Sequence, residues 1–215
     1  MRLVVQEFLS LDGVSQGPGG PDEDTSGGFS RGGWFVSSID GEFERVAGDW
    51  LGRAEGLLFG ADTYRNFARD WPGMDHPFAP VMNALPKYVV SRTLTPEAAL
   101  WDPTTVLDTE PLARLAELRA RPGAGELQVH GSARLAGTLL AAGLVDTLRL
   151  VIAPVVVGQG RRLFPATGPA LGFRPVERRV LPGGLTVLEL AATGTPSFGT
   201  YGAGSSGPVS PSSRV

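Results

Sequence analysis

The chain has 215 residues, of which 42% are hydrophobic, and it carries a formal net charge of −3 at pH 7 with a pI near 5.4. This length fits one domain with a sizeable core, and the lack of a basic excess argues against a nucleic-acid partner. The absence of cysteine excludes disulfides, thiolate metal sites and a cysteine nucleophile. No apolar run approaches the ~18 residues of a spanning helix, so we expect a soluble, cytoplasmic protein that does not enter a membrane.

Strands and helices are predicted to alternate along most of the chain, from β-rich runs and from apolar residues at helical spacing. The predicted strands are residues 2–11, 56–59, 87–91, 104–107, 126–130 and 147–157. The predicted helices are residues 41–51, 61–67, 111–120 and 133–142. A hairpin of residues 174–181 and 185–192 turns at Pro182-Gly183-Gly184. This order predicts an α/β fold with a mostly parallel central sheet, helices on both faces and a C-terminal antiparallel hairpin.

Two segments have no regular pattern. Residues 12–33 form a long loop with many glycines and prolines, and loops of that length within a compact domain are often functional. From Ser197 onward the chain is mostly glycine, serine and proline, which cannot bury enough apolar surface to become ordered. We therefore predict one domain over residues 1–196 and a disordered tail over residues 197–215.

Two strand–helix junctions carry residues that could bind a phosphate. Gly131 and Ser132 precede the helix at 133–142, with Ser132 at the N-cap and Gly143 at the C-cap. Residues 60–63, Gly-Ala-Asp-Thr, repeat the arrangement after another strand. Helix N-termini offer free N–H groups and a partial positive charge to a phosphate. Each junction could be ordinary capping, but two at one sheet edge could hold a pyrophosphate from both sides.

Other polar and aromatic residues allow two interpretations each. Arg92 follows the third strand together with Ser91, and it could clamp a ribose 2′-phosphate or be a solvated surface residue. Trp34 could stack on a flat substrate or belong to the core. His76 and His130 have no carboxylates at metal-ligand spacing, so we predict no metal site.

Six segments in a fixed order resemble a known family. They are Ser10-Leu11-Asp12-Gly13, residues 57–64, residues 87–92, His130-Gly131-Ser132-Ala133, Gly143-Leu144-Val145-Asp146 and residues 154–164. This set resembles the dihydrofolate reductase-like superfamily, with its three-layer fold. Within it, the set is most similar to the C-terminal reductase domain of the bifunctional riboflavin-biosynthesis deaminase–reductase and its stand-alone relatives. The resemblance covers about residues 1–192, and the block at 154–164 is its most specific part.

The resemblance implies an NADPH-dependent reductase that transfers hydride to a small heterocyclic or carbonyl compound, as 5-amino-6-(5-phosphoribosylamino)uracil reductase does. It also implies a homodimer, which is common in this branch. The cofactor residues it implies are Gly60 and Thr63 at the phosphates, Ser91 and Arg92 at the adenosine ribose, and Gly131, Ser132 and Ala133 at the pyrophosphate. The residues expected near nicotinamide and substrate are Asp12, Trp34, Gly158 and Gly160.

The sequence departs from the family pattern at two places. Asp62 stands where many relatives carry a basic residue, and its charge would oppose a nearby phosphate. Ile39 stands near the position of the carboxylate that protonates the pterin in dihydrofolate reductases, with Asp40 one residue on. The acid could therefore be Asp12, Asp40 or a bound water, although Asp40 could equally be a first-turn residue favoured by the helix dipole. A scaffold or binding protein of the same fold and a dihydrofolate reductase stay open as alternatives.

Overall fold

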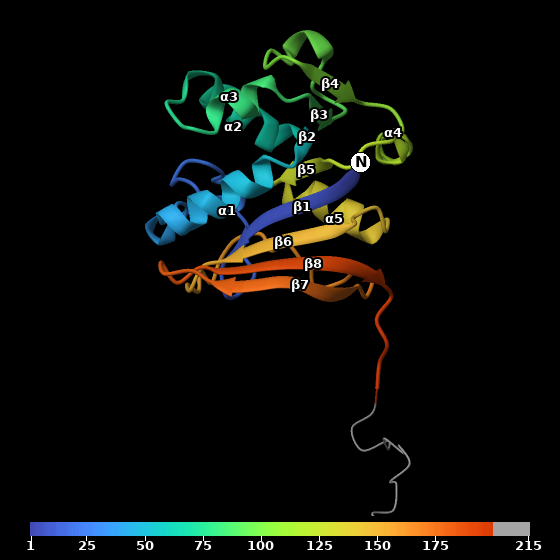
Figure 1. The fold of residues 1–215 in the computed structure, drawn as a ribbon. Helices are drawn as coiled ribbons and strands as arrows, with labels where there is room; N and C mark the ends of the chain where they lie inside the picture. Colours follow the sequence, from blue (N-terminus) through green and yellow to red (C-terminus); the bar gives the residue numbers. More distant parts are fainter. Residues whose placement is uncertain (200–215) are drawn as a thin grey trace, which may run out of the picture.

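The computed structural model describes residues 1–199, which form an α/β domain around one eight-stranded sheet (Figure 1). The strands are β1 (Arg2–Leu9), β2 (Ala54–Gly60), β3 (Lys87–Val90), β4 (Thr104–Leu107), β5 (Glu126–His130), β6 (Thr147–Ile152), β7 (Gly172–Val180) and β8 (Thr186–Gly194). Their order in the sheet is β4-β3-β2-β5-β1-β6-β8-β7. The strands from β4 to β6 in this order are parallel, whereas β8 pairs antiparallel with both β6 and β7. The predicted fold class is confirmed.

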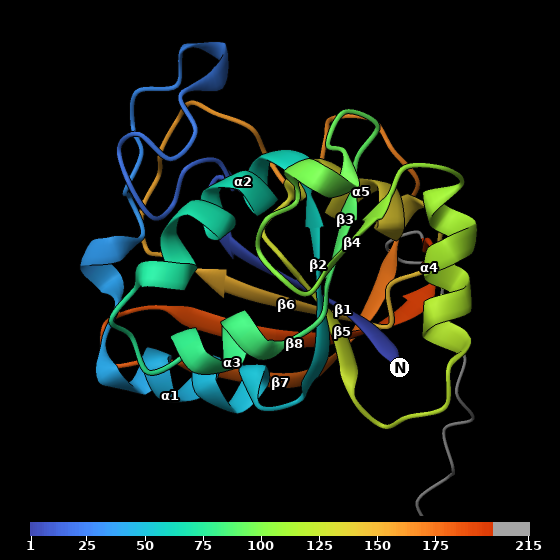
Figure 2. The same ribbon diagram turned by 90° about the horizontal axis from the view of Figure 1, so that it is seen from above.

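Helices cover both faces of the sheet (Figure 2). They are α1 (Gly41–Leu51), α2 (Ala61–Asp70), α3 (Ala79–Ala84), α4 (Pro111–Ala120) and α5 (Ala133–Ala141). Leucines of α4 and α5 pack with β1, β2, β5 and β6 on one face. Aromatic and aliphatic residues of α1, α2 and α3 pack on the opposite face. Burial on both faces explains the nearly continuous apolar runs of the inner strands.

Local sequence signals set the ends of two helices. Asp40 accepts a hydrogen bond from the Phe43 amide at 2.8 Å and begins α1, whose buried face carries Phe43, Val46 and Trp50. After α5, Gly143 adopts a left-handed φ of 66°. The Leu144 amide then donates to the Leu139 carbonyl at 3.1 Å, closing the helix end as the glycine predicted.

The structure corrects the sequence prediction in several places. The strand predicted over residues 2–11 ends at Leu9, and the helix predicted over residues 61–67 continues to Asp70. The strand predicted over residues 147–157 ends at Ile152, because Pro154 has no N–H to continue the ladder. The six-residue helix α3 was not predicted, since it is too short to show a helical repeat. The predicted tail lies mostly in residues 200–215, outside the described residues. Within residues 1–199, no helix has the length and apolar character needed to cross a bilayer.

Candidate functional site

A cleft of about 1530 Å³ opens at the carboxyl ends of the parallel strands. Strands β1 and β5 are adjacent in the sheet, and the helices that follow them, α1 and α5, pack on opposite faces of it. Such a reversal leaves a crevice where ligands bind in open α/β sheets. The pairing of β1 with β5 ends at Gln6 and His130, whereas its pairing with β6 continues to Leu9 and Ile152. The cleft therefore begins where β1 and β5 separate.

The two glycine junctions predicted from the sequence lie side by side at one edge of this cleft. The Gly60 amide donates to the Ser132 hydroxyl at 2.9 Å. A Cβ on Gly131 would lie 3.6 Å from Cγ2 of Thr63. The N-termini of α2 and α5 therefore open side by side, as expected for a pyrophosphate site. Ser132 occupies the N-cap position of α5 as predicted, but its hydroxyl makes no bond to the start of the helix and instead ties the two junctions together.

All seven residues predicted to bind a cofactor line the cleft: Gly60, Thr63, Ser91, Arg92, Gly131, Ser132 and Ala133. The Ser91 hydroxyl accepts hydrogen bonds from the Thr93 and Leu94 amides, at 3.1 and 2.9 Å, so it shapes the turn after β3. Arg92 is exposed at this end of the cleft. The acidic residues Asp108 and Glu110 also line the cleft, and the sequence reasoning did not identify them.

The unfavourable charge expected at Asp62 is partly offset. Its side chain is 89% exposed, and Arg65, one turn later on α2, lies 3.0 Å from its Oδ1. Both residues line the cleft, so the entrance carries a pair of opposite charges rather than a lone anion. Such an exposed pair contributes little stability, but it reduces the local repulsion of a phosphate.

Asp12 does not line the cleft and is unsuited to the catalytic role expected of it. Its carboxylate accepts hydrogen bonds from the Ser10 hydroxyl at 2.7 Å and from the amides of Val157 and Gly158 at 3.0 and 2.9 Å. The bond from Ser10 and then that from Val157 lower the pKa of Asp12 to about 2. An ionised carboxylate held in this way joins the end of β1 to the segment after β6, and it has no proton to give.

Asp40 also lies outside the cleft. Its side chain accepts from the Phe43 amide and, at 2.6 Å, from the Gly183 amide in the turn between β7 and β8. Asp40 therefore caps the first turn of α1, and it is not placed to donate a proton to a ligand in the cleft.

Trp34, Gly158 and Gly160, expected at the substrate, support the long loop from behind the cleft. The Trp34 indole donates to the Gln16 carbonyl at 2.8 Å, and its ring packs edge-on against Phe35. Gly160 has a φ of 106°, and a Cβ there would lie 2.8 Å from the ring of Phe29. These residues thus hold the loop in place, although none of them lines the cleft.

The neighbouring Arg161 does reach the cleft and fixes the part of the loop that lines it. Its guanidinium lies 3.0 Å from the carboxylate of Asp24 and donates to the Ser26 hydroxyl at 3.0 Å. Its amide donates to Oε1 of Gln16 at 2.9 Å. The motif at residues 154–164 therefore positions a cleft wall formed by the loop at residues 15–26.

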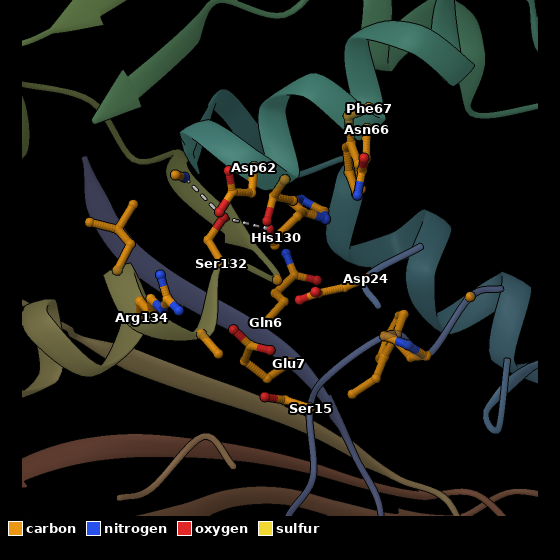
Figure 3. Close-up of a pocket in the computed structure, with 18 of the residues that line it drawn as sticks. Gln6, Glu7, Ser15, Asp24, Asp62, Asn66, Phe67, His130, Ser132 and Arg134 are labelled. Atoms are coloured by element: carbon orange, nitrogen blue, oxygen red, sulfur yellow. Dashed lines mark hydrogen bonds between the residues drawn. The ribbon is translucent and has the colours of Figure 1, made fainter. Parts of the chain in front are cut away.

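Three polar residues at the base of the cleft were not predicted as site residues: the buried Gln6 and Glu7 and the partly buried His130 (Figure 3). Within residues 1–199, Nε2 of Gln6 and Oε1 of Glu7 are covered and have no hydrogen-bond partner. Burial raises the pKa of the Glu7 carboxyl to about 8. The two polar residues interrupt an otherwise apolar strand, and that interruption was the signal available in the sequence.

His130 is held as a neutral imidazole. Burial, followed by the charge of Arg149, lowers the pKa of His130 to about 4. Its Nε2 lies 3.2 Å from Oε1 of Gln128, whose Nε2 donates to the Trp50 carbonyl and to Glu126. Because Oε1 of Gln128 is thereby assigned as an acceptor, Nε2 of His130 carries the proton and Nδ1 is an acceptor. No cluster of metal-ligand side chains occurs in the part of the chain that the structure describes.

The fold is that of a dihydrofolate reductase-like α/β domain, with the N-termini of α2 and α5 opening onto the cleft. The family model for the RibD C-terminal domain matches residues 2–187, so the chain belongs to that family. Membership supports a reductase, and reductases of this family use a nicotinamide cofactor. The Bacillus subtilis protein YyaP, itself uncharacterized, is 24% identical over 192 residues, which cover 87% of this chain and 93% of YyaP.

Solved structures show the same fold at low sequence identity. A putative riboflavin biosynthesis protein from Shewanella is 23% identical with a TM-score of 0.64, over 90% of this chain and 99% of that one. A pyrimidine reductase-like protein from Corynebacterium diphtheriae is 15% identical with a TM-score of 0.58, over 89% and 92%. The match to a deaminase/5-amino-6-(5-phosphoribosylamino)uracil reductase from Thermotoga maritima, 14% identical with a TM-score of 0.58, covers 89% of this chain and 56% of that chain.

Proposed function

We propose that the protein is an NADPH-dependent reductase that transfers hydride to a small heterocyclic or carbonyl compound. The observation that carries this proposal is the pair of helix N-termini, α2 and α5, held together by the bond between Gly60 and Ser132. They open onto a cleft whose base holds Gln6, Glu7 and His130. Phosphate-binding amides beside buried polar groups are what a nicotinamide reductase requires.

The residues present fit a dinucleotide. Gly60 and Gly131 carry no side chain that could cover the backbone from a pyrophosphate, and Gly131 has a left-handed φ of 56° that favours glycine. Arg92 is the cation available for a ribose phosphate at the end of β3, and it favours NADPH over NADH. The cleft volume of about 1530 Å³ exceeds the ~300–1000 Å³ of a typical small-molecule pocket, which leaves room for cofactor and substrate together.

The protein's part in the reaction is to bind and orient. When bound, the cofactor supplies a hydride. The amides of α2 and α5 would hold its phosphates, while Ser132 keeps the two junctions at a fixed separation. The loop at residues 15–26, tied down by Arg161, walls the cleft and limits water around the reacting atoms. Buried Gln6 and partly buried His130 offer a donor and an acceptor with which to orient a polar ring.

A pyrimidine or a related heterocycle is the substrate class that the relatives favour. Two of the similar proteins are named as a pyrimidine reductase-like protein and a 5-amino-6-(5-phosphoribosylamino)uracil reductase. The experiment is to follow NADPH oxidation by the full chain with 5-amino-6-(5-phosphoribosylamino)uracil, other pyrimidines, pterins and carbonyl compounds. Saturable oxidation with at least one compound is expected. Failure to oxidise NADPH with every class, together with no NADPH or NADH binding at millimolar concentration, would contradict the proposal.

The observations that favoured other functions are weaker in the structure. The scaffold alternative depended on Asp62, which is paired with Arg65. Dihydrofolate reduction depended on a carboxylate at the start of α1, and Asp40 points instead to Phe43 and Gly183. Dihydrofolate therefore belongs in the screen as a comparison, and we expect it to react more slowly than the preferred substrate.

We also propose a homodimer. The edge strand β7 is open to solvent on one side and carries the exposed apolar residues Val176 and Val180, which are 54% and 75% exposed. Unpaired strand edges with apolar side chains associate readily. Light scattering after size exclusion should give twice the 22.6 kDa mass of the chain. A monomer at all concentrations would contradict this part of the proposal.

A further inference from the structure

We propose that Glu7 is the proton donor of this reductase: its carboxylic acid gives a proton to the substrate nitrogen or oxygen beside the carbon that receives hydride. The proposal rests on the reductase function proposed above. It adds to that function a named acid, which neither the family match nor the sequence motifs supply.

The position of Glu7 in the sheet places its side chain at the base of the cleft. Glu7 follows Gln6, whose carbonyl accepts the last hydrogen bond between β1 and β5, from the Gly131 amide at 3.2 Å. The strands separate immediately beyond this bond. Figure 3 shows the carboxyl group of Glu7 projecting into the cleft between Gln6 and Ser15. The residue thus lies beside the junction that would hold the cofactor phosphates, in the part of the cleft open to a substrate.

The Glu7 side chain is buried without a partner. The residue is only 3% exposed, and its Oε1 makes no hydrogen bond within residues 1–199. A buried carboxyl group in this condition costs stability, because both its polarity and its charge lose hydration. A ligand that accepted a hydrogen bond from it would remove that cost. The Glu7 carboxyl group is therefore available to donate a hydrogen bond to an acceptor atom of the substrate.

The surroundings keep the acid protonated. On β6, the residue paired with Glu7 is the apolar Leu150. The charged side chains labelled around Glu7 in Figure 3 are Arg134 on α5, Asp24 on the loop and Asp62 on α2, while His130 on β5 is neutral. Burial is the cause that raises the pKa of Glu7 to about 8, so the carboxyl group holds its proton at neutral pH. A pKa close to the working pH suits general acid catalysis.

Other acids in the cleft are less suited to the role. Asp24 is paired with Arg161, and Asp62 with Arg65. Glu23 also has a pKa raised by burial, but its carboxylate accepts a hydrogen bond from the Gly19 amide at 2.6 Å and is occupied within the loop. Glu7 alone combines deep burial, a free oxygen and a place at the base of the cleft among the described residues.

The step balances in protons and electrons. A substrate C=N or C=O carbon gains a hydride from the reduced cofactor, which becomes its oxidised form. The π-electron pair moves to the substrate nitrogen or oxygen, which takes the proton from the Glu7 carboxyl group. A C–H bond and an N–H or O–H bond form, and the carboxylate left on Glu7 regains a proton from water in the cleft.

The test compares wild type with Glu7→Gln, which keeps the size and removes the acid. Glu117→Gln, an exposed change on α4 outside the cleft, is the matched control. Infrared difference spectra between pH 6 and 9, recorded without ligands, should show a protonated carboxyl band that is lost in Glu7→Gln and kept in Glu117→Gln. NADPH should bind Glu7→Gln as it binds wild type, and circular dichroism should show an intact fold.

The kinetic readout uses NADPH with the substrate selected by the screen. We expect kcat for Glu7→Gln to fall by about 100-fold or more with a small change in KM. Wild-type kcat should decline above pH ~8, and the residual rate of the variant should not follow that decline. Glu7→Asp, which keeps an acid one methylene shorter, should retain more activity than Glu7→Gln.

The outcomes separate this proposal from the function on which it rests. If wild type reduces substrate and Glu7→Gln binds NADPH and reduces it at the same rate, the role of Glu7 is overturned and the reductase function stands. An ionised Glu7 at pH 7 in the infrared spectra would also overturn it. If wild type neither binds NADPH nor oxidises it, both proposals fail together.

Discussion

Strands β1 and β5 bury a glutamate at each end of the region where they pair. One glutamate is paired with arginines, and the other has an oxygen without a hydrogen-bond partner among the described residues. Glu126, near the amino ends, is fully buried, and its oxygens accept from Arg149 at 2.7 and 2.8 Å and from Arg2 at 2.9 Å. Arg149 also stacks over Trp50, with 5.0 Å from its guanidinium carbon to the ring centre. Glu7, at the carboxyl ends, has no partner at Oε1 among the residues that the structure describes.

This difference separates structure from function within one sheet. The paired end satisfies each charge, and breaking a pair there leaves an uncompensated buried charge. The open end leaves polar groups unsatisfied, and such groups persist where a ligand or a reaction uses them. Changes at the paired end should therefore reduce stability, whereas changes at the open end should reduce binding or turnover.

The largest effect is expected at the paired end. Glu126→Ala leaves the guanidinium of Arg149, which is fully buried, with Glu189 as its remaining carboxylate. Removal of one partner from a buried ion pair costs about 3–5 kcal/mol, and urea unfolding should show a loss of this size. The exposed change Glu117→Ala should stay within about 0.5 kcal/mol. If Glu126→Ala lowers the free energy of unfolding by less than about 1 kcal/mol, the paired end does not stabilise the fold as argued, and the contrast with the open end is contradicted.

Glu7→Gln should change how stability depends on pH. Below pH ~4.5 both the folded and unfolded chains hold this proton, and between there and about 8 the folded chain alone keeps it. Stability of wild type relative to Glu7→Gln should therefore fall as pH rises, with a slope approaching about 1.4 kcal/mol per pH unit.

The useful pH window for this measurement is set by His130. Its lowered pKa of about 4 makes stability fall as pH decreases from 6.5 to 4, which opposes the effect of Glu7. Urea unfolding between pH 6.5 and 8 therefore isolates Glu7. Parallel stability curves for wild type and Glu7→Gln in that window would show that the acid is ionised throughout, and they would contradict the burial argument.

Arg92→Ala tests whether a change at the open end of the sheet affects cofactor binding without affecting stability. Arg92 is exposed, so its loss should leave stability unchanged and weaken NADPH binding by roughly tenfold while NADH binding stays the same. Calorimetric titration with each cofactor measures this, and Arg114→Ala, an exposed change on α4 outside the cleft, is the control. Equal weakening of NADPH and NADH would mean that Arg92 does not contact a 2′-phosphate.

The smallest effect is expected for Ser132→Ala. The variant loses the hydrogen bond from the Gly60 amide, which should cost about 0.5–1.5 kcal/mol of stability. NADPH binding should weaken several-fold as well, because the separation of the two junctions is no longer fixed. The exposed change Thr105→Ala on β4 should have neither effect, and a Ser132→Ala variant that matches it would show that the bond is dispensable.

Features encoded by neighbouring residues could be predicted from the sequence. The spacing of Phe43, Val46 and Trp50 and the proline at Pro111 located α1 and α4 at the bounds observed. The glycines at the ends of β2 and β5 were predicted together at one edge of the sheet, and both line the cleft, because a glycine before a helix is a local signal.

Features that depend on distant residues could not be predicted. Ser132 bonds Gly60 across 72 residues, and Asp12 meets Val157 across 145, so neither partner was visible from local patterns. Asp12 was therefore taken for an acid when its carboxylate serves as a structural acceptor. Glu7 was overlooked because its burial arises only once β5, β6 and α5 assemble around β1.

The most direct test of the account is a titration of the full chain with NADPH and NADH, followed by tryptophan fluorescence. Trp50 and Trp71 line the cleft, so a cofactor bound there should change their emission. The account predicts saturable NADPH binding well below millimolar concentration and weaker NADH binding. No binding of either cofactor at millimolar concentration would contradict the assignment of the cleft.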